Sequence, residues 1–395
     1  MKCIEYSNLN GGNMAKILAI AENFAFGPIS KLVTVVNELK KQGHEVTFIG
    51  YGTAYQLGSI QGYDHCYEFD TDSKEFLEWG KAIFKKNDLL ISSCDRSSML
   101  LAKQIGLPRI WLDILFWWWD GLPDFVYDAD LFIQQNSLNN ERNMKKFGHL
   151  VKNMFIVGPI IDLTYKDIKQ NNTLFISYGG MEAKGWYTIG KESNYPYTIT
   201  DLIIKKVDIS SYDKVIFSGN AAIMEELKNR HPGDKFSFGT LNRSEILRCI
   251  GEARDVLIIP GLETPLEAIA YNKSVMYLPP SNSSQYVQLD EFRKIGLADK
   301  QNSIHFADYY PYKNLAGKDL RKIMDIFLKE LKIYEHDNDA LDNTAKRINQ
   351  FIHSSQKSRN EQIKVEKKFM KSLGDNGLNQ SVKIINKFIN TLSRE

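Results

Sequence analysis

The sequence is poor in the features that mark secreted, membrane or disulfide-bonded proteins. Among its 395 residues the cysteines are few, scattered and without a CxxC pair: Cys3, Cys66, Cys94 and Cys249. Such unpaired thiols are typical of a reducing compartment, so we expect a cytoplasmic protein. The most apolar run, 110–119, is interrupted by Asp113. It is also much shorter than the roughly 18 residues that a membrane span needs.

Several catalytic signatures are missing as well. The sequence has no GxxxxGK[ST] and no GxSxG, so phosphate-loop nucleotide hydrolases and α/β-hydrolases have no support. The seven histidines show no metal-ligand spacing, and Asp-x-Asp pairs are expected by chance among 48 acidic residues. We therefore predict no metal requirement. The formal net charge of +2 gives no reason to propose a nucleic-acid partner.

Short apolar runs alternate with helical patterns through most of the chain. In the first half these runs predict strands at 16–21, 45–49, 88–92, 109–113, 131–134 and 154–157. Between the first two runs, Ile29, Leu32, Val33 and Val36 recur at helical spacing, and Gly43 ends the pattern. Strand–helix–strand units of this length form the right-handed crossovers of a parallel sheet.

The same pattern restarts after a segment rich in Gly, Pro and polar residues. It predicts further strands at 173–177, 214–218, 235–238, 255–259 and 274–278, and then helices at 319–332, 339–354, 357–371 and 381–393. We predict an α/β protein of two facing Rossmann-like domains, 15–158 and 173–315. A linker, 159–172, joins them, and a helical C-terminal segment, 316–395, follows.

Small and polar residues follow the predicted strands of the second half, where open parallel sheets bind their ligands. The first two strands are followed by Gly179-Gly180 and by Gly219-Asn220. Glycines allow backbone amides to approach phosphate oxygens closely. The turn with Gly261 and Thr264 opens a predicted helix, whose N-terminus attracts anions.

One turn into that helix, Glu267 faces the same way as Thr264, and its carboxylate suits the two hydroxyls of a ribose. This pattern predicts a nucleotide-diphosphate site. The alternative is an ordinary βαβ unit with a capped helix.

The second half resembles the donor domain of GT-B glycosyltransferases, in particular the family-1 UDP-glycosyltransferases and the peptidoglycan N-acetylglucosaminyltransferase. The family box spaces a Gly, a Ser or Thr and a Glu as Gly261, Thr264 and Glu267 are spaced here, and Gln285 follows the proline turn LPPSNSSQ. The box histidine is replaced by Ile259. In the first half, GPISKLVTVVNELKKQGHEVTFIG is similar to the family's opening helix and second strand. The resemblance extends over about residues 15 to 310.

The resemblance implies a transferase that moves a sugar from a nucleotide-sugar donor, most typically UDP-linked, to a small acceptor. Glu267 would hold the ribose, and Gln285 would contact the sugar hydroxyls. The diphosphate would lie on Gly261 and Thr264 together with Gly179 and Gly180. The segment from Phe238 to Leu241 would border the base.

The catalytic base is not fixed by the resemblance. Inverting members use a histidine in the loop after the first strand, and the corresponding position here, near Ala25, has none. Glu22 lies at the same strand end and is our first candidate, if burial near Phe24 and Phe26 raises its pKa. Asp113 and Asp120 are rival candidates. Without a base, the chain would be a retaining enzyme or an inactive relative.

Four tryptophans lie within nine residues, 111–119, after a predicted strand of the first domain. Tryptophan rings bind flat or sugar-like ligands well. We predict that Trp117, Trp118 and Trp119, with Phe26, line an acceptor site for an aromatic, nucleoside-like or hydrophobic molecule. The alternatives are packing against the C-terminal helices and an oligomer contact.

Two other functions stay open. A non-hydrolysing UDP-sugar 2-epimerase shares the two-domain plan, and an inactive auxiliary protein would explain the missing histidines. In each enzyme the nucleotide sugar is a substrate, so we predict no cofactor. A peripheral membrane contact or a dimer, through the aromatic segment or the basic tail, is a further alternative.

Overall fold

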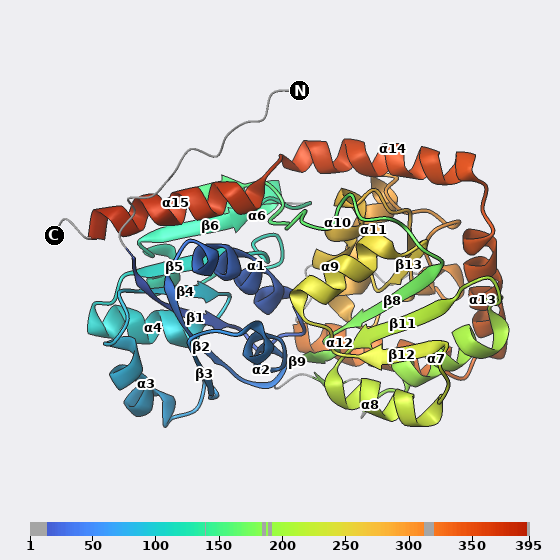
Figure 1. Ribbon diagram of the computed structural model, residues 1–395, viewed down its shortest axis with the longest axis horizontal. Coiled ribbons are helices and arrows are strands. Elements are labelled where there is room, and N and C mark those ends of the chain that lie inside the picture. Colours follow the sequence, from blue (N-terminus) through green and yellow to red (C-terminus); the bar gives the residue numbers. More distant parts are fainter. Residues whose placement is uncertain (1–13, 139, 184–186, 189–191, 312–319, 393–395) are drawn as a thin grey trace.

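Two parallel β-sheets form the framework of the protein (Figure 1). The computed structural model describes residues 14–392, except 139, 184–186, 189–191 and 312–319. The α/β fold class predicted from the sequence is confirmed, with two Rossmann-like domains.

The first sheet has seven strands in the order β3-β2-β1-β4-β5-β6-β7. Its strands are β1 (Lys16–Ala21), β2 (Glu45–Gly50), β3 (His65–Glu68), β4 (Leu89–Ser93), β5 (Arg109–Asp113), β6 (Leu131–Gln135) and β7 (Met154–Val157). The helices are α1 (Gly27–Lys41), α2 (Gly52–Gly58), α3 (Phe76–Phe84), α4 (Arg96–Ile105), α5 (Asp124–Tyr127) and α6 (Asn140–Phe147). Most of these strands are apolar and buried on both faces, as expected for a parallel sheet covered by helices.

The second sheet has five strands in the order β12-β11-β8-β13-β14. They are β8 (Thr173–Gly179), β11 (Lys214–Gly219), β12 (Phe236–Gly239), β13 (Asp255–Ile258) and β14 (Val275–Tyr277). Its helices are α7 (Tyr195–Lys206), α8 (Ala221–Arg230), α9 (Arg243–Glu252), α10 (Glu263–Ala270) and α11 (Ser283–Lys294). A small antiparallel pair, β9 (Glu182–Ala183) and β10 (Tyr187–Thr188), follows β8.

The C-terminal helices are α12 (Leu320–Tyr334), α13 (Asn338–Ile352), α14 (Gln356–Leu373) and α15 (Gly377–Leu392). The predicted boundary between residues 315 and 316 lies outside the described residues. In Figure 1, α14 runs along the second domain and α15 continues across the first. Val382, Ile385 and Ile389 of α15 are buried in the core of the first domain. The domain built on the first sheet therefore takes residues from both ends of the chain. In the described part of the chain, no helix has the length and apolar character to cross a membrane.

Candidate functional site

The carboxyl ends of the two sheets meet directly. The loop between β1 and α1 touches the turn between β8 and β9, where the amide of Ala25 donates to the carbonyl oxygen of Glu182 at 2.7 Å. The contact is so close that a Cβ on Gly180 would lie 2.6 Å from the carbonyl carbon of Ala25. The structure thus brings together the loop predicted to carry the catalytic base and the turn predicted to hold a diphosphate.

Left-handed backbone occurs after three of the strands, twice in the loops of this junction. Ala25, Cys94 and Met181 have φ angles of 46°, 61° and 49°, in the left-handed region that residues other than glycine rarely adopt. Each lies in a loop that follows a strand: β1, β4 or β8. Such strain persists only where the surroundings hold it, and it is frequent at ligand sites.

The predicted donor glycines differ in their surroundings. Gly179 adopts a positive φ of 65°, and its carbonyl oxygen lies 3.3 Å from the Cβ position of Gly219. Gly261 lies before α10 and has no atom within 4 Å of its Cβ position. Thr264, in the first turn of α10, is half-buried. The approach to the α10 N-terminus is therefore the open part of the predicted site.

The other predicted donor residues lie around the same edge. Asn220 caps α8 and donates to Glu182 at 3.3 Å. The ring of Phe238 is half-buried and stacked on Phe217 at 4.8 Å, while Leu241 is half-buried three residues further on. Gln285 is buried, and its Oε1 accepts hydrogen bonds from the amide and the hydroxyl of Ser281 at 2.8 and 3.0 Å.

Glu267 lies in a buried cluster of charges between the domains. Its Oε1 is 2.5 Å from Arg243 of α9 and 3.6 Å from the ammonium of Lys31, which belongs to α1 of the first domain. Lys31 also forms an ion pair with Glu263 and donates to the carbonyl oxygen of Ile160 at 2.6 Å. We name Lys31, Arg243, Glu263 and Glu267 the interdomain charge cluster. Two cations and two carboxylates balance its formal charge.

Burial and mutual attraction act against each other in this cluster. Burial lowers the pKa of Lys31 to about 7, against the attraction of Glu267. Burial alone would raise the pKa of Glu267, but Arg243 and Lys31 outweigh it and lower that pKa. Glu267 is only 1% exposed. Its ribose-binding role stays a prediction, and in the conformation described the carboxylate is occupied by protein cations.

The three candidate bases have very different environments. Glu22 is half-buried at the end of β1, beside the junction between the domains. Asp113 is fully buried and accepts hydrogen bonds from the indoles of Trp111 and Trp119 at 2.7 and 3.0 Å and from the amide of Leu115 at 2.7 Å. Burial raises the pKa of Asp113 to about 6, against these hydrogen bonds. Asp120 is exposed. Asp113 already accepts three hydrogen bonds from residues of its own strand and loop. Glu22, which borders the junction between the domains, therefore remains our first candidate.

The predicted acceptor residues pack against different hydrophobic cores. Trp117 is 5% exposed and belongs to the core of the second domain, which also includes residues of α12 and α13. Trp118 is half-buried with its ring 5.2 Å from that of Trp117. Trp119 faces the first-domain core and has the guanidinium of Arg96 4.9 Å from its ring. Phe26, half-buried before α1, packs against the same domain. Trp117 thus links the two domains by packing, and the acceptor role of these four residues stays a prediction.

Comparison with solved structures shows which fold this is. UGT73P12 of Glycyrrhiza uralensis, complexed with glycyrrhetinic acid 3-O-monoglucuronide, matches with a TM-score of 0.53 at 12% identity over 96% of both chains. UGT89C1 of Arabidopsis thaliana, complexed with UDP, matches with 0.53 at 10% identity over 96% of this chain and all of the other (100%). LpCGTa in complex with UDP matches with 0.50 at 10% identity over 96% and 99%. The chain has the GT-B fold of glycosyltransferases. No family model and no curated protein sequence matches it.

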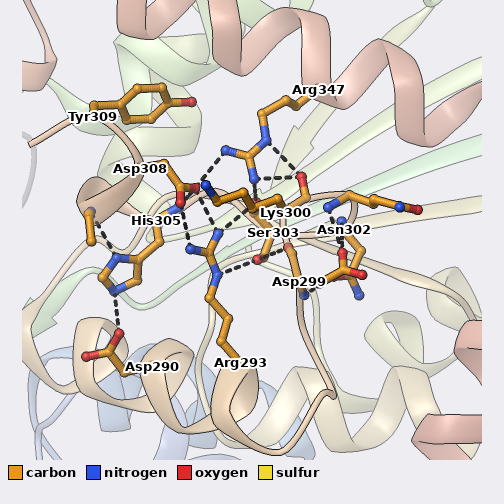
Figure 2. Close-up of polar contacts among 12 residues, drawn as sticks. Asp290, Arg293, Asp299, Lys300, Asn302, Ser303, His305, Asp308, Tyr309 and Arg347 are labelled. Carbon is orange, nitrogen blue, oxygen red and sulfur yellow. Dashed lines mark hydrogen bonds and ion pairs between the residues drawn. The ribbon is translucent and has the colours of Figure 1, made fainter.

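In this GT-B chain a polar network fixes the helix that carries Gln285. Figure 2 shows the guanidinium groups of Arg293, from α11, and Arg347, from α13, converging on Asp308. Arg293 binds both carboxylate oxygens, at 2.8 and 2.9 Å, and Arg347 adds a third contact at 2.7 Å. His305 lies in the same network, with Nε2 3.4 Å from Asp290, and burial lowers its pKa to about 4. These contacts hold α11 against α13, and they give His305 a structural role.

Sequence reasoning missed Lys31, Arg243 and Glu263. Lys31 lies within the apolar helix α1, and nothing local distinguishes it from a solvated lysine. A weak signal was present in α10, where Glu263 and Glu267 are four residues apart and repel each other unless cations lie nearby. Among the described residues, no three His, Cys, Asp or Glu side chains are grouped as metal ligands.

Proposed function

We propose that the chain is a glycosyltransferase that takes a sugar from a nucleotide donor, UDP-linked as the first choice. The observation that carries this is the position of the α10 N-terminus. It lies beside Gly261 at the carboxyl edge of the second sheet, where Glu263 and Glu267 of α10 pair with Lys31 of the first domain. UDP is bound in the similar UGT89C1 and LpCGTa structures, which supports the choice of nucleotide.

In this proposal each part of the site has one task. The amides before α10 and the hydroxyl of Thr264 hold the diphosphate and stabilise its charge as it departs. The carboxylate of Glu267 accepts hydrogen bonds from the ribose hydroxyls. Glu22 takes the proton of the acceptor hydroxyl while the oxygen of that hydroxyl attacks the anomeric carbon of the donor sugar. The acceptor lies near Phe26, Trp118 and Trp119.

Donor entry requires the interdomain charge cluster to rearrange. Glu267 cannot hold a ribose while Lys31 and Arg243 both face it, so the first domain must withdraw Lys31 before the donor binds. Opening and closure of two domains around a ligand is a common way to expel water from a reaction.

The direct test is a panel of nucleotide sugars incubated with the purified chain, with and without cell extract as a source of acceptor. Release of free nucleotide that depends on the extract supports the transferase. Interconversion of the sugar without release supports the epimerase. No binding of any nucleotide by calorimetry contradicts both.

A matched pair of substitutions tests the site itself. Thr264→Val removes the hydroxyl at nearly constant volume, whereas Thr264→Ser keeps it. We expect Thr264→Val to raise the KM for the donor about tenfold, because a hydrogen bond to a charged phosphate is lost. Thr264→Ser is expected to stay near the wild-type value. Equal KM values for both variants would place the diphosphate elsewhere.

A non-catalytic role is the second candidate, and a specific observation favours it. The carboxylate predicted to bind the ribose is already paired inside the protein, and Gly180 is pressed against Ala25. Such a protein would keep the fold but bind no donor. Calorimetry with UDP separates the two candidates before any acceptor is known.

A further inference from the structure

A second concave site lies at the opposite edge of the second sheet. A cavity of about 550 Å³, open to solvent, lies between the starts of β13 and β14 and the junction of α13 with α14. That junction is at the right-hand end of Figure 1. Asp255 begins β13 and Gly261 follows it, so this cavity and the proposed donor site lie at opposite ends of one strand.

The cavity is lined by basic groups without matching acids. Arg254, Lys273 and Arg359 line it, and none of the described residues that line it is acidic. The nearest compensating charge is the fully buried Asp255, which pairs with Arg254 at 3.2 Å and with Arg359. Tyr212 donates to the same carboxylate at 2.6 Å. Arg254 and Arg359 therefore share one carboxylate, and Lys273 forms no ion pair with a described residue, so these four side chains carry a formal excess of two positive charges.

Lys273 has hydrogen-bonding capacity to spare. Its ammonium donates to the carbonyl oxygens of Gly251 and Ala253 at 2.7 and 2.8 Å. An ammonium has three protons, so one donor is left for a ligand. Burial lowers the pKa of Lys273 to about 8, against the attraction of Asp255, and a bound anion would offset that shift.

A long helix also begins at this cavity. The first residue of α14, Gln356, is part of the lining, and Ser355 caps the helix by accepting from Ser358 at 3.2 Å. The N-terminus of an 18-residue helix carries partial positive charge and free amide donors. The helix adds to the field of the basic side chains.

We propose that this cavity binds the phosphoryl group of a small ligand, either free phosphate or a phosphate monoester such as a sugar phosphate. The excess of basic side chains, the spare donor of Lys273 and the helix N-terminus all favour a compact dianion. The cavity is within the size range of small-molecule sites. A bound phosphoryl group contacts both the α13–α14 junction and the sheet. This site is separate from the proposed donor site.

The test uses the full chain and two probes, inorganic phosphate and glucose 1-phosphate, at constant ionic strength. We expect both to raise the thermal unfolding temperature and to bind in calorimetry. Tighter binding of glucose 1-phosphate identifies a monoester ligand, and equal binding identifies free phosphate. If neither probe has more effect than chloride, the proposal is wrong.

Two variants locate the response. Lys273→Gln is expected to weaken phosphate binding about tenfold or more, since a charged donor is lost. Gln356→Glu places a carboxylate at the start of α14, where it suits the helix but repels an anion, so it tests the site even if Lys273→Gln fails to fold. Lys346→Gln, on the exposed face of α13, is the control and is expected to bind phosphate normally.

A last variant tests whether the phosphate binds at the proposed donor site instead of in this cavity. Thr264→Val is expected to leave the phosphate response unchanged. If Thr264→Val abolishes the response while Lys273→Gln and Gln356→Glu keep it, the anion binds at the α10 N-terminus and this inference is overturned.

Discussion

Lys31 is the residue on which the junction between the domains depends most. It is completely buried, and its ammonium pairs with two carboxylates of the other domain. Removing one partner of a buried ion pair leaves an uncompensated charge, which typically costs about 3–5 kcal/mol. We expect Lys31→Met to lower the free energy of unfolding by this amount, measured by urea denaturation.

Two further variants serve as controls for Lys31→Met. Lys41→Met changes an exposed lysine of the same helix and is expected to stay within about 0.5 kcal/mol of wild type. In Lys31→Met, Glu267 keeps Arg243 but Glu263 loses its cation. Adding Glu263→Gln to Lys31→Met removes that carboxylate, so part of the lost stability should return. If Lys31→Met is as stable as Lys41→Met, Lys31 does not hold the interdomain charge cluster together.

The same cluster shows where residue-level prediction from sequence stops. The position of Glu267, one turn into a helix after a glycine turn, follows from local spacing and is as expected. That its carboxylate faces Lys31 depends on how two domains pack, and no local pattern contains this. For the same reason Glu267→Ala cannot test donor binding alone, because it also removes the carboxylate that Lys31 and Arg243 share.

The lysine-rich helix α14 contains one buried acidic residue, Glu366. Glu366 is 1% exposed and accepts from Gln362 at 2.7 Å, while Gln362 also donates to the carbonyl oxygen of Val275 in β14 at 2.9 Å. Burial raises the pKa of Glu366 to about 8. The folded chain thus holds this proton more tightly than the unfolded chain. The contribution of Glu366 to stability should therefore fall as the pH rises from about 4.5 to 8.

We expect Glu366→Gln to remove this pH dependence, because an amide keeps the hydrogen bond from Gln362 and never ionises. The variant should be more stable than wild type by about 2–4 kcal/mol at pH 7 and nearly equal to it at pH 4. Denaturation at several pH values measures this difference. Glu361→Gln, an exposed acid of the same helix, is the control and should show no such trend. A constant difference between Glu366→Gln and wild type at all pH values would contradict the prediction.

Elements were predicted well from sequence where burial is uniform. β5 and β7 begin and end where their apolar runs do. β3 is not marked by an apolar run, because three of the four residues of His65–Glu68 are exposed at the edge of the sheet. The lysine-rich sequence of α14 is typical of a solvated helix. Its buried side, with Glu366 and Leu373, arises because the chain must cross from one domain to the other, which is a property of the whole fold.

At the scale of the whole molecule, the two domains are held by contacts that the sequence keeps far apart. α15 returns to the first domain, where a Cβ on Gly377 would overlap the carbonyl oxygen of Gly158. Trp117 enters the second-domain core, and Lys31 enters the interdomain charge cluster. These contacts set how close the predicted base and the α10 N-terminus lie.

Gly180 provides a direct test of this closed arrangement. Because its Cβ position is 2.6 Å from the backbone of Ala25, Gly180→Val cannot be accommodated while the domains touch. We expect the domains to separate, at a cost of about 1–3 kcal/mol. The radius of gyration from small-angle X-ray scattering should then increase, and Lys31 should become accessible to amine-reactive labels. Gly261→Ala, which has open space for its Cβ, is the matched control and should change neither quantity. An unchanged radius together with continued protection of Lys31 in Gly180→Val would mean that the junction adapts locally and that closure does not depend on the contact of Gly180 with Ala25.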